Sequence, residues 1–106
     1  HVLQGIEEYN GKFIIYSLAN FCFGANRNPV DKDTMIFQQT FTFVDGVKQE
    51  DRQIQIIPCS VSSARDRNNF QPTPAQGEEA ARIIQRINGY SAGYGVVFAQ
   101  DGTLCQ

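Results

Sequence analysis

Residues 34–58, TMIFQQTFTFVDGVKQEDRQIQIIP, contain two strand-like runs that meet at the dipeptide Asp45-Gly46. This dipeptide tolerates the positive φ angles of a tight turn and therefore predicts a hairpin. Each arm is about ten residues long, and apolar residues largely occupy every second position, as in strands packed on one face. These positions are Phe37, Phe41, Phe43, Ile54 and Ile56. We expect the polar tip of the hairpin to project into solvent.

A second hairpin is predicted before this stretch, around the dipeptide Asn10-Gly11. Residues 2–9 form its first arm and residues 12–21 its second, and residues 13–16 of the second arm are all apolar. A run without alternation is typical of a strand covered on both faces, so we predict that this arm is buried. Residues 24–33 and 60–74 are rich in turn-forming and charged residues, which indicates surface loops.

One helix is predicted toward the C-terminus, since apolar residues there recur at the spacing of a single helical face. They are Ala80, Ile83, Ile84 and Ile87. Residues 73–76 fit a capping box with proline at the first helical position, although Gly77 allows a later start, and residues 88–89 predict the end. Residues 94–100 read as a final strand. The prediction is an α+β fold of mostly antiparallel strands in two long hairpins, one C-terminal amphipathic helix and a final strand, within a single segment spanning residues 1–106.

Composition narrows the classes of function that the chain can serve. The 106 residues include 9 Lys and Arg, 11 Asp and Glu and 42% hydrophobic residues, for a net charge of -2. This balance predicts a folded domain without nucleic-acid partners, because binding to phosphate backbones needs clustered basic residues. No apolar stretch approaches the roughly 20 residues that cross a bilayer. Cys22, Cys59 and Cys105 form no C-x-x-C pair, and we expect all three to be buried small hydrophobic residues.

Two short motifs suggest chemistry but fit structural roles better. Residues 89–93, GYSAG, match the pattern of a serine hydrolase, but they follow a predicted helix instead of a strand, and no histidine follows Ser91. We therefore predict a helix end and linker here. Arg65 and Arg67 could hold an anionic ligand, although a hydrated surface loop is the favoured interpretation.

The acidic pairs of the sequence are also expected to be solvated surface. Glu7 and Glu8 are neighbours on a predicted strand and so point to opposite faces. Glu78 and Glu79 lie in the first turn of the predicted helix, where the dipole favours anions, and Glu78 is four residues before Arg82.

Two segments of the sequence resemble a known family. Residues 1–12, HVLQGIEEYNGK, and residues 15–23, IYSLANFCF, are similar to the H-V-L-Q-x-x-E-x-Y-x-G-K and Y-S-L-G-N-F-x-F signatures of the CapA family. These are bacterial capsule and poly-γ-glutamate biosynthesis proteins related to calcineurin-like metallophosphoesterases. The strand ending at Pro58 and the helix beginning near Gly77 also resemble the later part of that domain.

The resemblance implies that the chain is the C-terminal part of a CapA-like domain, a four-layer αββα sandwich. His1 would then be the last histidine of a segment that contributes to a dinuclear metal centre of Mn, Zn or Fe, with Gln4 just behind it and Asn20 nearby. The other ligands of the family lie upstream of His1, so this chain alone would hold no cofactor and no catalytic residue. Ala19 replaces the glycine of the family signature, which implies a different local turn if that position needs a positive φ. Asn20 would orient or cap this loop.

Two functions follow from the resemblance. In the first, the chain is a scaffold segment of a protein for capsule or poly-γ-glutamate synthesis, with metal-dependent phosphoesterase-like chemistry confined to the complete domain. In the second, it is a non-enzymatic module that binds the polymer or a membrane polymer synthase, with a degenerate metal site. The resemblance places the parent protein on the outer side of the cytoplasmic membrane or at the cell surface. Strands without the rest of their domain would leave apolar surface uncovered, so we expect self-association.

Overall fold

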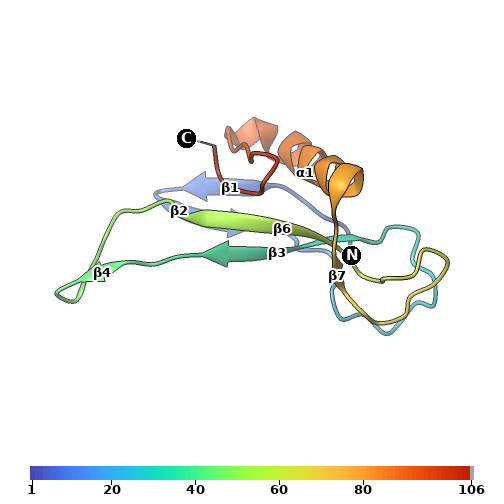
Figure 1. The fold of residues 1–106 in the computed structure, drawn as a ribbon. Coiled ribbons are helices and arrows are strands. Elements are labelled where there is room, and N and C mark those ends of the chain that lie inside the picture. The colour runs from blue at the N-terminus through green and yellow to red at the C-terminus, as the bar shows by residue number, and fades with distance from the viewer. Residues whose placement is uncertain (106) are drawn as a thin grey trace.

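A computed structural model describes residues 1–105 and shows an α+β arrangement, in which one α-helix lies across antiparallel strand pairs (Figure 1). The first pair is β1 (Ile6–Tyr9) and β2 (Lys12–Ile15), and the turn between them has positive φ at Asn10 and Gly11, as predicted. The predicted buried arm is wrong, because β2 ends at Ile15 and its outer face is exposed. Its apolar residues alternate between an inner face, where Phe13 and Ile15 pack against the core, and an outer face, where Ile14 is exposed.

The second hairpin joins β3 (Asp33–Gln39) to β6 (Ile54–Ser60), and β6 also pairs with the short β7 (Thr73–Pro74). Its distal part is the pair β4 (Phe43–Val44) and β5 (Val47–Lys48), which turns at Asp45 and Gly46 as predicted.

This distal part projects far from the body of the molecule (Figure 1), and we call it the β4–β5 arm. Phe37 packs against the core, but Phe41 is 52% exposed and Phe43 is 60% exposed. The prediction that the whole apolar face is packed is therefore wrong. The alternation is continuous, but the described body of the protein ends before it reaches these two side chains.

The helix α1 (Gly77–Ser91) buries the predicted face through Ile83, Ile84 and Ile87. The capping box predicted at residues 73–76 is wrong, and the later start at Gly77, which the sequence also allowed, is confirmed. The chain at residues 73–74 pairs with β6 as β7, so the capping box does not form and the helix begins at Gly77.

The helix also continues past residues 88–89. Asn88 is not the helix end, because its side-chain amide donates to the Phe98 carbonyl oxygen at 3.0 Å and accepts from the Phe98 N–H at 2.8 Å. These bonds hold the returning chain against the helix.

The predicted final strand is replaced by the 3-10 turn η1 (Ala92–Tyr94) and an irregular segment. This segment forms isolated bridges, Phe98 with Leu104 and Gln55 with Thr103, around a turn in which Gly102 has a φ of 85°. The core lies between the helix and the inner faces of the strands. It comprises Leu3, Ile6, Met35, Ile54, Ile56, Ile83, Ile84, Ile87, Val96, Phe98 and Leu104.

Candidate functional site

The residues that the sequence analysis placed at a metal site are brought together in part. His1 Nδ1 lies 2.8 Å from Asn20 Oδ1, and the His1 ring lies against Phe23 with 5.6 Å between the ring centroids. We call His1, Asn20 and Phe23 the histidine cluster. An amide oxygen can only accept a hydrogen bond, so Nδ1 is the donor in this pair. In the neutral ring, Nε2 then carries the lone pair that binds metals.

The turn before Asn20 keeps a left-handed backbone. Ala19 has a φ of 64°, a conformation that favours glycine, although the residue is alanine. Ala19 thus adopts the positive φ that a glycine at this position would allow, so the replacement of glycine by alanine does not require a different turn. Asn20, which follows this turn, accepts a hydrogen bond from His1 at the start of the chain.

The contacts of Gln4 do not include the histidine cluster in the described residues. Its backbone N–H donates to the Ser17 carbonyl oxygen at 3.3 Å, and its side chain is exposed. Within residues 1–105, no hydrogen bond joins the Gln4 side chain to His1 or Asn20.

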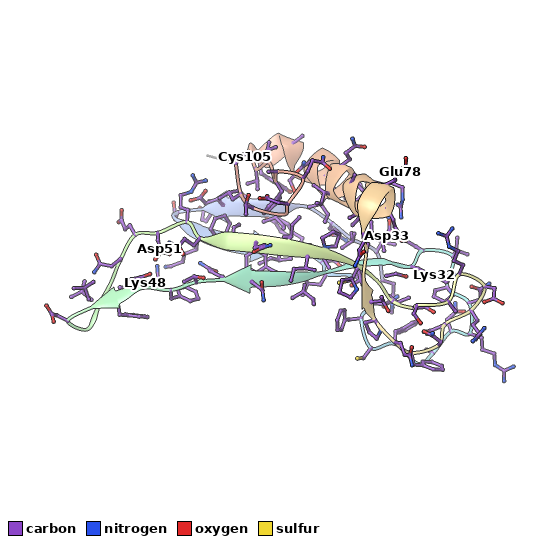
Figure 2. The ribbon with its side chains drawn as sticks, viewed as in Figure 1. Lys32, Asp33, Lys48, Asp51, Glu78 and Cys105 are labelled. Carbon is purple, nitrogen blue, oxygen red and sulfur yellow. The ribbon has the colours of Figure 1, made fainter. Side chains whose placement is uncertain are left out.

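A larger polar site lies where β3, β6, β7 and the first turns of α1 meet. It is a cleft of about 1030 Å³, which we call the polar cleft. Figure 2 shows Asp33 below the start of α1, with Glu78 above it and Lys32 beside it. Residues of both charges and several hydroxyl groups line the cleft, among them Asp33, Ser62, Arg65, Thr73, Glu79 and Arg82.

The inner wall of the cleft is an ion-pair network between the start of β3 and the polar face of α1. Arg82 donates to both carboxylate oxygens of Asp33 at 2.7 Å, and Arg86 donates to Asp33 at 2.7 Å and to Asp31 at 2.6 and 2.9 Å. We call Asp31, Asp33, Arg82 and Arg86 the acid–arginine network. It replaces the helical pair of Glu78 and Arg82 that the sequence analysis expected, since Asp33 offers Arg82 a fixed, buried carboxylate.

The network sets the charge state of its carboxyl groups. Hydrogen bonds from Arg86 lower the pKa of Asp31 below its ordinary value. Burial alone would raise the pKa of Asp33, but the bonds from Arg82 and Arg86 outweigh it, so the pKa of Asp33 is also lowered. The carboxylates and guanidinium groups therefore stay charged and paired near neutral pH.

The loop with Arg65 and Arg67 is held by amide side chains. Asn68 is buried and its Nδ2 donates to the Phe23 carbonyl oxygen at 2.6 Å, while Asn69 Oδ1 accepts from Ser62 Oγ at 2.9 Å. Arg67 is exposed and lies 3.4 Å from Asp66, as expected of a hydrated loop. Arg65 lines the polar cleft instead.

Sequence reasoning missed the acid–arginine network. Its signal is Asp31 and Asp33, two residues apart before a strand, together with Arg82 and Arg86, four residues apart on one helical face. Both spacings can be seen in the sequence, but only the tertiary structure shows that the two aspartates contact the two arginines.

Ser91 has a structural role, as predicted. It is fully buried, and its Oγ accepts the Ile6 N–H at 3.0 Å, which ties the end of α1 to β1.

The acidic pairs are separated or exposed as expected. Glu8 pairs with Arg52 at 2.5 Å, whereas Glu7 accepts from Tyr16 and raises the pKa of that phenol to about 12. Glu78 and Glu79 are exposed in the first turn of α1.

The prediction for the cysteines holds only for Cys59, which is buried, and burial raises the pKa of its thiol. Cys22 and Cys105 are exposed, so the prediction is wrong for them. Both lie in irregular segments beyond the core.

Residues 1–105 contain no cluster of three or more His, Cys, Asp or Glu placed to hold a metal ion. None of the helices formed by these residues has the length and apolar character that crossing a membrane requires.

Comparisons with known proteins give no family assignment. The sequence matches no protein-family model, and no curated protein is found to match it.

Proposed function

We propose that this chain is the C-terminal part of a CapA-like domain in a protein for capsule or poly-γ-glutamate synthesis, in which His1 is one ligand of a divalent metal pair. The observation that carries the proposal is the 2.8 Å bond between His1 Nδ1 and Asn20 Oδ1. Histidines that bind metals almost always donate their other ring N–H to an oxygen acceptor, which fixes the tautomer and the ring orientation. The same two residues belong to the two quoted signature motifs.

In this proposal the chain supplies orientation, and the rest of the domain supplies the remaining ligands. A pair of Mn, Zn or Fe ions polarises a phosphoryl oxygen and lowers the pKa of bound water. His1 would bind through Nε2, Asn20 would hold the ring in place, and Phe23 would cover one side of it. The described residues offer too few donors to hold two ions, so the isolated chain should not take up two ions tightly.

The surroundings follow from the same proposal. The complete domain would be an αββα sandwich, whose other parts would cover the exposed outer face of β2. A membrane polymer synthase is a further partner, and the site of action is the outer side of the cytoplasmic membrane or the cell surface.

The test uses the longer protein that the proposal implies. Metal content and Mn²⁺- or Zn²⁺-dependent cleavage of a phosphodiester are measured for the wild type, for His1→Ala and for Gln100→Ala, an exposed control. His1→Ala should lower both metal content and rate, and Gln100→Ala should change neither. Equal metal content and equal rates in all three proteins would contradict the proposal.

The polar cleft favours a second function, a non-enzymatic module that binds an anionic polymer. Arg65 lines the cleft and has no ion-pair partner among the described residues, so its guanidinium group is available to a carboxylate. Titration with poly-γ-glutamate should show binding that Arg65→Ala weakens and that Arg67→Ala, the exposed neighbour, leaves unchanged. Binding that is the same in all three proteins, or no binding to the wild type, would exclude this function for the cleft.

A further inference from the structure

We propose that Thr34 is a positioning residue for His1, which it orients through the turn at Ala19 and the side chain of Asn20; the inference rests on the proposed function for His1. Thr34 is fully buried near the start of β3, where it pairs with Cys59 of β6. Its Oγ1 donates to the Leu18 carbonyl oxygen at 2.8 Å. The paired strands thus hold the loop that carries Asn20.

The turn at Ala19 needs such a restraint. A left-handed backbone costs a residue with a Cβ atom about 1–2 kcal/mol. Ala19 nevertheless has a φ of 64°, and the peptide group that joins Leu18 to Ala19 is hydrogen-bonded at both its N–H and its carbonyl oxygen. Its own N–H donates to Ser17 Oγ at 3.1 Å, and the preceding carbonyl accepts from Thr34.

The conformation of Ala19 affects His1 through Asn20. Asn20 follows Ala19 directly, and its Oδ1 accepts from His1 Nδ1 at 2.8 Å. If the backbone of Ala19 relaxes to a negative φ, the direction of the next peptide changes and Asn20 Oδ1 moves away from the ring. His1 then loses the bond that keeps the proton on Nδ1 and leaves Nε2 open to a metal.

A hydroxyl group that merely satisfies a buried carbonyl would affect stability without affecting the imidazole. The two roles are therefore separated by the tautomer of His1, which the nitrogen NMR spectrum of the neutral ring reports. His1 is the only histidine of the chain, so its signals are assigned without ambiguity. The measurement uses this chain without any metal.

The variants are Thr34→Val, which removes the hydroxyl group but keeps the shape, Thr34→Ser, which keeps the hydroxyl group, and Thr40→Val on the exposed part of the same hairpin. The wild type should populate the Nδ1–H tautomer. Thr34→Val should lower the ratio of Nδ1–H to Nε2–H on the order of fivefold, as the loss of one hydrogen bond predicts. Thr34→Ser and Thr40→Val should keep the wild-type ratio.

Two further variants keep the test decisive if Thr34→Val does not fold. Ser17→Ala removes the other restraint on Ala19 and should also lower the ratio. Ala19→Gly removes the cost of the left-handed backbone, so Thr34→Val should have a smaller effect in that background. An unchanged ratio in Ser17→Ala and in folded Thr34→Val would overturn the inference, and so would an equal effect of Thr34→Val with and without Ala19→Gly.

Failure of the inference is distinct from failure of the proposed function. Asn20→Ala should abolish the preference for Nδ1–H if the histidine cluster forms at all. A loss of preference in Asn20→Ala without one in Thr34→Val or Ser17→Ala overturns the positioning role alone. If Thr34→Val, Ser17→Ala and Asn20→Ala change the tautomer ratio as expected, but His1→Ala leaves the metal content of the longer protein unchanged, the proposed function alone is overturned.

Discussion

At the scale of single residues, backbone conformation decides which positions accept a side chain. Gly102 and Gly46 both have positive φ, 85° and 79°, but their surroundings differ. A Cβ atom on Gly102 would lie 2.0 Å from the carbonyl oxygen of Ile56, whereas no atom lies within 4 Å of the corresponding position on Gly46. The same requirement for positive φ thus has a larger structural consequence inside the molecule than at the tip of the arm.

We predict that Gly102→Ala lowers the free energy of unfolding by about 3 kcal/mol. This sum contains the cost of a left-handed backbone for alanine and the loss of the hydrogen bond from the Ile56 N–H to the Gly102 carbonyl oxygen. Gly46→Ala should cost about 1–2 kcal/mol, the backbone cost alone. Urea unfolding of both variants measures the difference. Equal losses would show that the close approach at Ile56 does not matter.

Ala19 is the opposite case, a residue with a side chain at a position that favours glycine. Ala19→Gly should raise the free energy of unfolding by up to about 1 kcal/mol, since it removes the left-handed cost and adds only chain entropy. Ala81→Gly, in the middle of α1, should lower it by about 1 kcal/mol. Thermal and urea unfolding report both signs, and a loss of stability in Ala19→Gly would contradict the assigned backbone.

At the scale of elements, the acid–arginine network joins α1 to the start of β3. Arg82 and Arg86 come from one face of the helix, and Asp31 and Asp33 come from the loop and strand that the helix covers. Asp33 is buried at the centre of the network, whereas the Arg82 side chain stays 55% exposed. The network fixes the position of the helix along the sheet, in addition to the non-directional packing of its isoleucines.

We predict that this contact weakens in acid. The folded pKa values of Asp31 and Asp33 lie below the ordinary 3.8, so their contribution is complete above about pH 5 and is lost as the pH falls through the folded values. Asp33→Asn should lower the free energy of unfolding by about 2 kcal/mol near neutral pH and flatten its decline below pH 5.

The matched control is Asp66→Asn, which changes an exposed carboxylate in the loop after β6. Its stability and acid dependence should follow the wild type. Urea unfolding between pH 3 and 7, in about half-unit steps, gives the slopes. A wild-type slope in Asp33→Asn would show that Asp33 is not paired in the folded protein.

At the scale of the whole molecule, apolar surface remains uncovered in several places. One is the outer side of β2 and the chain after it, with Ile14 and Leu18, and another is the β4–β5 arm, with Phe41 and Phe43; Val30 and Phe70 are exposed elsewhere. The described part of the chain extends 49 Å in its longest direction. An elongated molecule with such surfaces gains free energy by covering them.

We therefore expect self-association of the isolated chain, with a second copy covering part of this surface. Light scattering over a range of concentrations should show a mass above that of the monomer, and Phe41→Ser with Phe43→Ser should reduce it. Gln53→Ser, an exposed polar change, serves as the control. A monomer at high concentration would contradict this expectation.

Interactions between near neighbours in the chain account for the features that were predicted correctly. The turns at residues 10–11 and 45–46, the apolar face of the helix and the α+β class follow from φ preferences and periodicity, which act over a few residues. The tertiary contacts, in contrast, set which apolar side chains of a strand are packed: β2 and the β4–β5 arm alternate as strands should, but Ile14, Phe41 and Phe43 remain exposed. They also determine that Asn88 holds Phe98 instead of ending the helix, and that Asp33 meets Arg82 and Arg86. Such contacts join groups about fifty residues apart or across a turn, and their energy depends on burial, which the order of residues does not specify.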